Sequence, residues 1–95
     1  MREYELMLIL PADVDDAGVD AVSRRISGIL DQRGGEFGQV DQWGRRRLAY
    51  EIDRQSEGYY LVIRFTGTPE SLTELDRVLS LADDVVRFKV VVRAA

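Results

Sequence analysis

The 95-residue sequence contains no cysteine and no histidine. Without cysteine the chain forms no disulfide and offers no thiolate nucleophile. Without histidine it lacks the side chain used most often for general acid–base catalysis and for zinc binding. Only carboxylate, serine or substrate-assisted chemistry remains for an enzyme. We therefore expect a protein that is not an enzyme and that needs no cofactor and no metal.

Long apolar runs are also missing. No stretch approaches the roughly 20 apolar residues that a membrane span needs. The apolar segment 6–10 is too short for a signal peptide. A hydrophobic content of 45% and a charged content of 32% are ordinary for a soluble globular chain of this length. We therefore expect one domain, residues 1–95, in the cytoplasm.

Lysine is nearly absent, because Lys89 is the one basic residue that is not arginine. Arginine suits phosphate recognition, since its planar fork bonds two oxygens at once. A GC-rich genome produces the same bias, so arginine content alone decides nothing. The net charge of −4 argues mildly against a nucleic-acid binder, but residues 42–95 hold nine basic and eight acidic side chains, against four and nine in residues 1–41.

Hydrophobic periodicity predicts six elements. The first helix is expected to begin among the acids at 13–16 and to stop at Gly34-Gly35, and Thr68-Pro69-Glu70 is a typical helix start. Gly28 inside the first helix either costs up to about 1 kcal/mol or permits close packing on the sheet. The predicted strands are 2–10, 36–52 with a bend near Gly44, 58–66 and 85–93, and the predicted helices are 13–33 and a second from 69 to the break at Ala82.

The order β-α-β-β-α-β predicts an α+β, ferredoxin-like fold. Each helix has one apolar stripe, so both helices should cover the same face of a four-stranded antiparallel sheet. Right-handed crossovers place the first and third strands at the centre. The other sheet face is left bare, and many unrelated functions use it.

One segment combines basic and aromatic residues, since Arg45, Arg46 and Arg47 stand between Trp43 and Tyr50. Guanidinium groups neutralise phosphates, and rings stack on bases or on arginine. Strand alternation should turn Arg46 away from Arg45 and Arg47 unless a bulge re-aims part of the run. A charged edge strand that avoids aggregation explains the same pattern, and spacing alone favours neither interpretation.

A second basic group follows the last predicted strand, where Arg87, Lys89 and Arg93 share one parity. Arg2 begins the first strand, which we expect to lie beside it. These residues predict a basic strip on one side of the sheet, with Arg93 nearer to Arg2 than Arg87 is. Ordinary solvated alternation is an equal alternative.

With these residues in view, the chain resembles the family of bacterial small-subunit ribosomal protein six along nearly its whole length. The resemblance depends on four short motifs in register. They are Met1-Arg2-x-Tyr4-Glu5, Trp43-Gly44-Arg45-Arg46-Arg47-Leu48-Ala49-Tyr50-x-Ile52, Gly58-x-Tyr60 and Asp84-x-Val86-Arg87. Many members have proline after the Ala-Tyr pair, where this chain has Glu51.

The resemblance implies a structural protein of the small ribosomal subunit. It implies binding to the central domain of small-subunit ribosomal RNA, paired with small-subunit ribosomal protein eighteen. The RNA-binding candidates it implies are Arg2, Arg45, Arg46, Arg47, Arg87 and Lys89. Trp43, Tyr50 and Tyr60 are implied as contacts to the protein partner or as supports of the RNA surface, and the sequence does not separate these two roles.

A ligand-binding homodimer is the alternative from another class. Ferredoxin-like domains often pair through their bare sheet faces and bind metabolites there. Met7, Ile9, Val62 and Val91 have the outward parity that such a dimer needs. This alternative leaves the arginine triplet unexplained.

Overall fold

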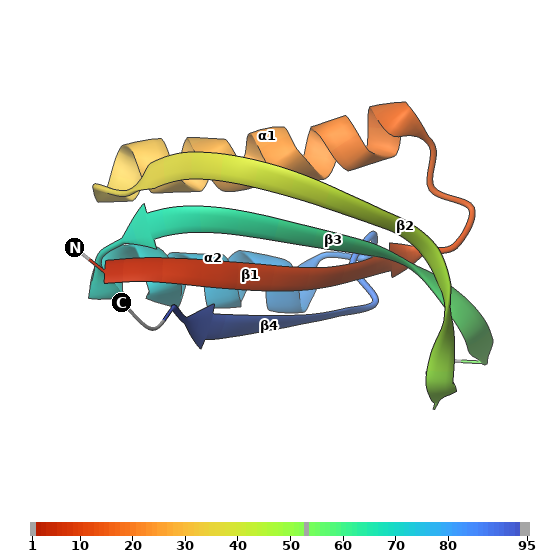
Figure 1. Cartoon of the computed structure of the whole chain (residues 1–95). Coiled ribbons are helices and arrows are strands. Elements are labelled where there is room, and N and C mark those ends of the chain that lie inside the picture. Colours follow the sequence, from red (N-terminus) through yellow and green to blue (C-terminus); the bar gives the residue numbers. More distant parts are fainter. Residues whose placement is uncertain (1, 53, 94–95) are drawn as a thin grey trace.

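The computed structural model describes residues 2–52 and 54–93 and confirms the predicted fold (Figure 1). The four strands form one antiparallel sheet in the order β2-β3-β1-β4, with β3 and β1 at the centre. Neither helix in the described chain is long and apolar enough to cross a membrane. The elements are β1 (Arg2–Pro11), α1 (Asp16–Arg33), β2 (Glu36–Ile52), β3 (Gln55–Gly67), α2 (Pro69–Leu81) and β4 (Arg87–Val92).

Several element boundaries differ by one to three residues from the predicted ones, and β4, for example, begins at Arg87 rather than at residue 85. Helix α1 begins at Asp16 rather than at residue 13, because the side chain of Asp15 accepts a hydrogen bond from Gly18 N at 2.8 Å and so acts as the N-cap. The β2–β3 hairpin remains paired as far as Ile52 opposite Gln55, where a polar loop over 53–58 was expected. The hairpin therefore projects past Pro11, the end of β1, as an arm formed by residues 46–52 and 54–57 (Figure 1).

The core lies between the sheet and the two helices, and the predicted apolar stripes fill it. Alternate residues of β1 and β3 point into it, and so do the stripes of α1 and α2. Each such side chain contributes about 1.5–3 kcal/mol when fully buried. The buried cluster consists of Tyr4, Leu6, Leu8 and Leu10 from β1, Val19, Val22, Ile26 and Leu30 from α1, Leu61, Ile63 and Phe65 from β3, and Leu75 and Leu79 from α2.

Polar contacts fix the junction between the two helices. Ser71 N donates to Thr68 Oγ1 at 3.2 Å and Thr68 N donates to Ser71 Oγ at 2.9 Å, which completes a capping box at the start of α2. The Thr68 hydroxyl also donates to the carbonyl of Arg33 at 2.9 Å. Gly34 ends α1 in the left-handed region, at φ 84°, as predicted. The start of α2 is therefore tied directly to the end of α1.

A bidentate ion pair connects α1 to the turn before β4. Arg25 donates from Nη1 and Nη2 to the two carboxylate oxygens of Asp84, at 3.2 and 3.0 Å. These hydrogen bonds, helped by the positive charge of Arg25, lower the pKa of Asp84 below its ordinary value of 3.8 against a smaller opposing effect of burial. The pair anchors the chain where it enters the last strand.

Replacing Gly28 by alanine should stabilise the domain. An added Cβ would have no atom within 4 Å, so the close-packing interpretation of this glycine is wrong. Gly28→Ala should raise the free energy of unfolding by about 0.5–1 kcal/mol, since it removes backbone freedom from an exposed helical position. Urea denaturation measures the change. An unchanged or lower midpoint would contradict the open surroundings of this residue.

Acid should abolish the contribution of Asp84. Because its pKa is lowered in the folded state, its stabilisation is fully present above the ordinary value of 3.8 and is lost as the pH falls through the lowered value. Asp84→Asn should cost less than about 1 kcal/mol at neutral pH, since both side chains are partly exposed, and nothing at strongly acidic pH. Thermal melts across pH test this, with Asp83→Asn as the neighbouring control. Equal curves for both variants would contradict the assignment.

Candidate functional site

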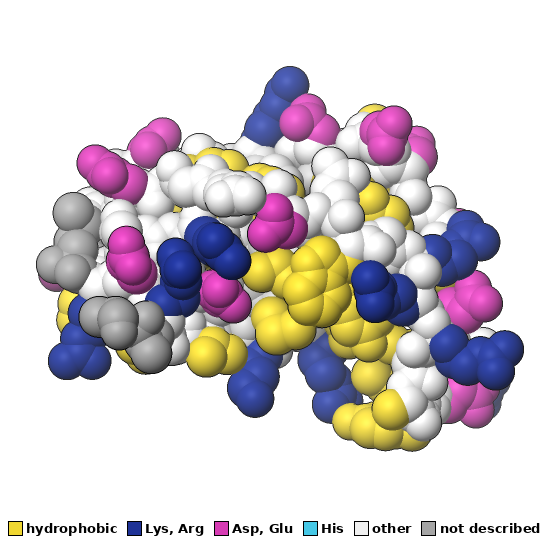
Figure 2. Space-filling model, viewed as in Figure 1, with side chains coloured by type: hydrophobic (Ala, Val, Ile, Leu, Met, Phe, Trp, Pro, Cys, Tyr) yellow, Lys and Arg dark blue, Asp and Glu magenta, His cyan; other side chains and the backbone are white. Residues whose placement is uncertain are grey.

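The sheet face opposite the helices carries the candidate site. The register puts Met7 and Ile9 of β1 on this outward face, opposite Val62 and Tyr60 of β3. On the other side of β1 they stand opposite Lys89 and Arg87 of β4. Figure 2 looks onto this face and shows hydrophobic side chains gathered over the central strands, with Lys and Arg side chains around them.

A pocket opens in this apolar patch. Its volume is about 370 Å³, and it is lined by Met7, Ile9, Tyr60, Arg87, Phe88 and Lys89. Aliphatic and aromatic side chains supply most of the lining, and the two cations come from the edge strand β4. No acidic side chain lines it. The pocket therefore suits an apolar group that carries a negative charge beside it.

The base of the arm packs on this face through a glycine. A Cβ added at Gly58 would lie 2.5 Å from Cγ2 of Ile9 and 3.4 Å from Cδ2 of Leu48. Leu48 is only 7% exposed although it lies in the arm. The sequence analysis did not single out Leu48. The available signal was its position two residues after Arg46 in β2, which puts this apolar side chain on the same face of the strand. Ile9 and Leu48 thus both pack against the backbone of Gly58, where no side chain intervenes.

A bulge in β2 determines the direction of the arginine triplet. The pairing shifts between Gln42, opposite Leu61, and Gly44, opposite Tyr60, so Trp43 is the extra residue. Gly44 has φ 82°, a left-handed conformation that glycine adopts without strain. The bend expected near Gly44 is therefore a one-residue bulge.

Beyond the bulge, the three arginines separate between the two faces as alternation predicts. Arg46 stands opposite Gly58 on the outward face, with its guanidinium carbon 5.4 Å from the centre of the Trp43 ring. Arg45 and Arg47 stand opposite Tyr59 and Glu57 on the other face. There Arg45 Nε donates to the carbonyl of Ala12 at 3.1 Å.

The predicted basic strip is wrong in two respects. Arg2 shares the parity of buried Tyr4, so it lies on the helix side of the sheet and not on the face that carries Arg87 and Lys89. Arg93 lies near the start of β1, as expected, and its backbone N donates to Glu3 O at 3.0 Å. Its side chain, however, is paired with Glu3 at 4.0 Å and with Glu5 at 3.6 Å.

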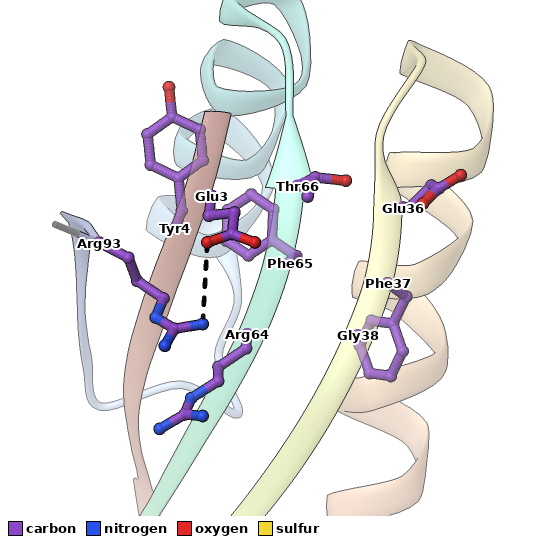
Figure 3. Close-up of a pocket in the computed structure, with 9 residues that line it drawn as sticks. All are labelled: Glu3, Tyr4, Glu36, Phe37, Gly38, Arg64, Phe65, Thr66 and Arg93. Carbon is purple, nitrogen blue, oxygen red and sulfur yellow. Dashed lines mark ion pairs between the residues drawn. The ribbon is translucent and has the colours of Figure 1, made fainter. Parts of the chain in front are cut away.

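These carboxylates neutralise that end of the sheet. Arg64 is also paired with Glu5, at 3.4 Å. Figure 3 shows Arg64 and Arg93 beside Glu3 at a smaller pocket lined by the starts of β1 and β2, by the end of β3 and by Arg93. The sequence placed Arg93 on this face by its parity and by the expected pairing of the last strand with the first, and the acids Glu3 and Glu5 on that first strand were not weighed as its partners.

Ion pairing divides the basic residues into two groups. Within residues 2–52 and 54–93, the ion pairs involve Arg24, Arg25, Arg33, Arg64, Arg77 and Arg93. None of them includes a residue that the sequence predicted to bind RNA. Those residues, Arg2, Arg45, Arg46, Arg47, Arg87 and Lys89, make no ion pair within 4.0 Å with a carboxylate of the described residues.

The three predicted aromatic residues all reach the outward face. Trp43 and Tyr50 are 47% and 64% exposed, and Tyr60 is half-buried in the wall of the pocket. The Tyr50 hydroxyl accepts a hydrogen bond from Arg87 Nη1 at 3.4 Å. The outward face thus combines Trp43, Tyr50 and Tyr60 with Arg46, Arg87 and Lys89, while Arg2, Arg45 and Arg47 lie off it.

The fold and this face together define a class of protein. It is a small α+β binding module whose site is the uncovered face of its sheet. The described residues contain no group of three His, Cys, Asp or Glu side chains with metal-binding geometry.

The comparisons with known proteins identify the family. A family model described as ribosomal protein S6 matches residues 3–92, and the chain belongs to that family. Small ribosomal subunit protein bS6 of Carboxydothermus hydrogenoformans is 44% identical over 96% of this chain and 95% of its own length. The same protein of Symbiobacterium thermophilum is 46% identical over 96% of each chain. The crystal structure of 30S ribosomal protein S6 from Thermotoga maritima aligns with a TM-score of 0.85 at 30% identity, over 97% of this chain and 87% of that one.

Family membership confirms three expectations. The chain is a ribosomal protein with a structural role in translation, and it is not an enzyme. Its place is the ribosome of the cytoplasm. The ferredoxin-like fold is the fold of the family.

Adding a side chain at Gly58 should disturb the outward face. Gly58→Ala should cost about 1–3 kcal/mol, since Ile9 Cγ2 lies 2.5 Å from the new Cβ and must move. Urea denaturation measures the cost, and chemical shifts of the Ile9 and Leu48 methyl groups locate it. The matched variant is Gly28→Ala, which adds the same methyl group in open space. A Gly58→Ala domain as stable as the parent chain would contradict the packing described for the arm.

Proposed function

We propose that this chain binds the central domain of small-subunit ribosomal RNA together with small-subunit ribosomal protein eighteen. The observation that carries the proposal is the outward face, where an apolar patch adjoins cations that form no ion pair with the carboxylates of residues 2–52 and 54–93. Phosphates need such cations, and a protein partner needs such a patch.

The six basic residues that the sequence predicted to bind RNA, none of which has an ion pair in the described chain, supply the RNA contacts in this proposal. Arg46, Arg87 and Lys89 act from the outward face. Arg47 acts from the opposite side of the arm, and Arg2 acts from the start of β1. Arg45 contributes by its charge while its Nε is bonded to Ala12 O. The RNA therefore contacts the arm and the sheet at more than one side.

The partner protein covers the apolar patch in this proposal. Met7, Ile9 and Tyr60 provide the surface that the partner covers, and the exposed rings of Trp43 and Tyr50 lie outside it. A second copy of this chain fits less well. In a face-to-face homodimer each copy would bring its own Arg87 and Lys89 to the interface, and like charges brought close together there cost energy.

The net charge makes the two binding events cooperative. At −4 the chain repels RNA at long range, so its few local cations should bind weakly when the chain is alone. A basic partner reduces that repulsion and completes the surface. Partner binding and RNA binding should therefore strengthen each other reciprocally.

The test measures binding to a central-domain RNA fragment across a salt series, with and without protein eighteen. Adding the partner should raise the affinity about 5–150-fold. Arg46→Ala and Arg87→Ala should each lower the salt slope by about 1 and weaken the ternary complex. Both variants should melt like the parent chain, since exposed substitutions usually cost within about 0.5 kcal/mol.

Arg24→Ala is the matched control. Arg24 lies on α1, paired with Asp20 at 3.0 Å, so its loss changes the net charge equally but away from the face. It should leave the salt slope unchanged. Equal RNA affinity with and without the partner, or equal losses for Arg24→Ala and Arg87→Ala, would refute the proposal.

A further inference from the structure

Two arginines of the outward face are held by aromatic side chains and not by carboxylates. We infer that Trp43 and Tyr50 are positioning residues, which hold Arg46 and Arg87 over the sheet for an RNA phosphate without neutralising their charge. This inference rests on the proposed function and assigns to the two rings a role in RNA binding rather than in partner binding.

The side chain of Tyr50 contacts that of Arg87, although the two residues belong to strands that are not paired with each other. Tyr50 lies in the arm and Arg87 at the start of the edge strand β4, and their side chains meet at 3.4 Å. Ile9 and Tyr60 lie in the pocket wall beside Arg87. The contact uses one of the five N–H donors of the guanidinium and leaves the others for phosphate oxygens. The hydroxyl is neutral, so the full charge of Arg87 remains.

Trp43 reaches Arg46 because of the bulge. In an unbroken strand, residues three apart point to opposite faces. The extra residue in β2 reverses the alternation between Gln42 and Gly44. The guanidinium of Arg46 consequently lies over the Trp43 ring, at 5.4 Å from its centre. A cation–π contact of this kind orients the guanidinium plane while its edge stays open to hydrogen bonds.

The carboxylate-held arginines provide the contrast. Arg64 and Arg93 lie on the same sheet face, but Glu3 and Glu5 hold them. A phosphate that approaches them must displace or overcome a carboxylate. Arg46 and Arg87 present no such barrier. At one end of this sheet face the arginines therefore have neutral neighbours and are available for binding. At the other end the arginines have acidic neighbours and form structural ion pairs.

A double-mutant cycle tests the inference. Tyr50→Phe keeps the ring and removes the hydroxyl, and it should weaken RNA binding by the parent chain about two- to five-fold. In an Arg87→Ala background it should have no effect, because the group on which it acts is gone. Trp43→Leu should behave in the same way with Arg46→Ala, again by about two- to five-fold. Affinity for protein eighteen, measured without RNA, should not change in either variant.

Tyr59→Phe is the matched control. Its hydroxyl, in the same hairpin, donates to Gln42 Oε1 at 2.8 Å, but it lies on the helix side of the sheet. It should leave RNA affinity unchanged. Losses that persist at full size in the Arg87→Ala and Arg46→Ala backgrounds would overturn the inference, because the rings would then contact RNA directly. Weaker binding of the partner protein would overturn it too.

A measurement on the free chain separates this inference from the proposed function. The NMR order parameters of the Arg87 and Arg46 side-chain Nε–H groups should fall in Tyr50→Phe and Trp43→Leu respectively. Falling order with no RNA binding by the parent chain would mean that the rings hold the arginines but the proposed function fails. Unchanged order would overturn the inference even where RNA binds.

Discussion

The alternation of side chains along β1 is the constraint on which the rest of the structure depends. This strand is hydrogen-bonded on both edges, to β3 and to β4, so its register is fixed from two sides. Its even residues from Tyr4 to Leu10 are buried under the helices, and its odd residues lie on the open face. A shift of one position would bury Glu3 and Glu5 and expose the centre of the core. The same pattern thus determines both the stability of the domain and the composition of its site.

Sequence patterns predicted the fold because each signal was local and several agreed. The period of α1, the capping hydroxyl of Thr68 and the alternation of β1 all follow from neighbouring residues in the chain. The division of the arginine triplet was predicted on the same basis. Arg93 was different, because its partners Glu3 and Glu5 belong to a strand about 90 residues away. Pairing of this kind depends on register, which a single sequence does not specify.

The candidate site also depends on contacts that a single sequence does not specify. Its charged and aromatic members Arg46, Arg87, Lys89, Trp43, Tyr50 and Tyr60 were named from the sequence, yet their grouping was not. The bulge at Trp43 decides which arginine joins the apolar patch, and the hydrogen bond between Tyr50 and Arg87 links positions 37 residues apart. Leu48 was missed because its burial depends on the bare backbone of Gly58. Composition thus indicated the chemistry of the surface, and geometry decided which side chains act together.

The bulge also makes the charges on the open face depend on the number of residues in β2. The extra residue in β2 is bordered by Gly44, whose missing side chain leaves open space around it. Removing one residue there would leave the helices and the central strands unaltered, but it would exchange the two sides of everything that follows in β2. Arg45 and Arg47 would turn to the open face, and Arg46 would turn away. Whether β2 holds an odd or an even number of residues before the arginine triplet therefore determines which arginines lie on the open face.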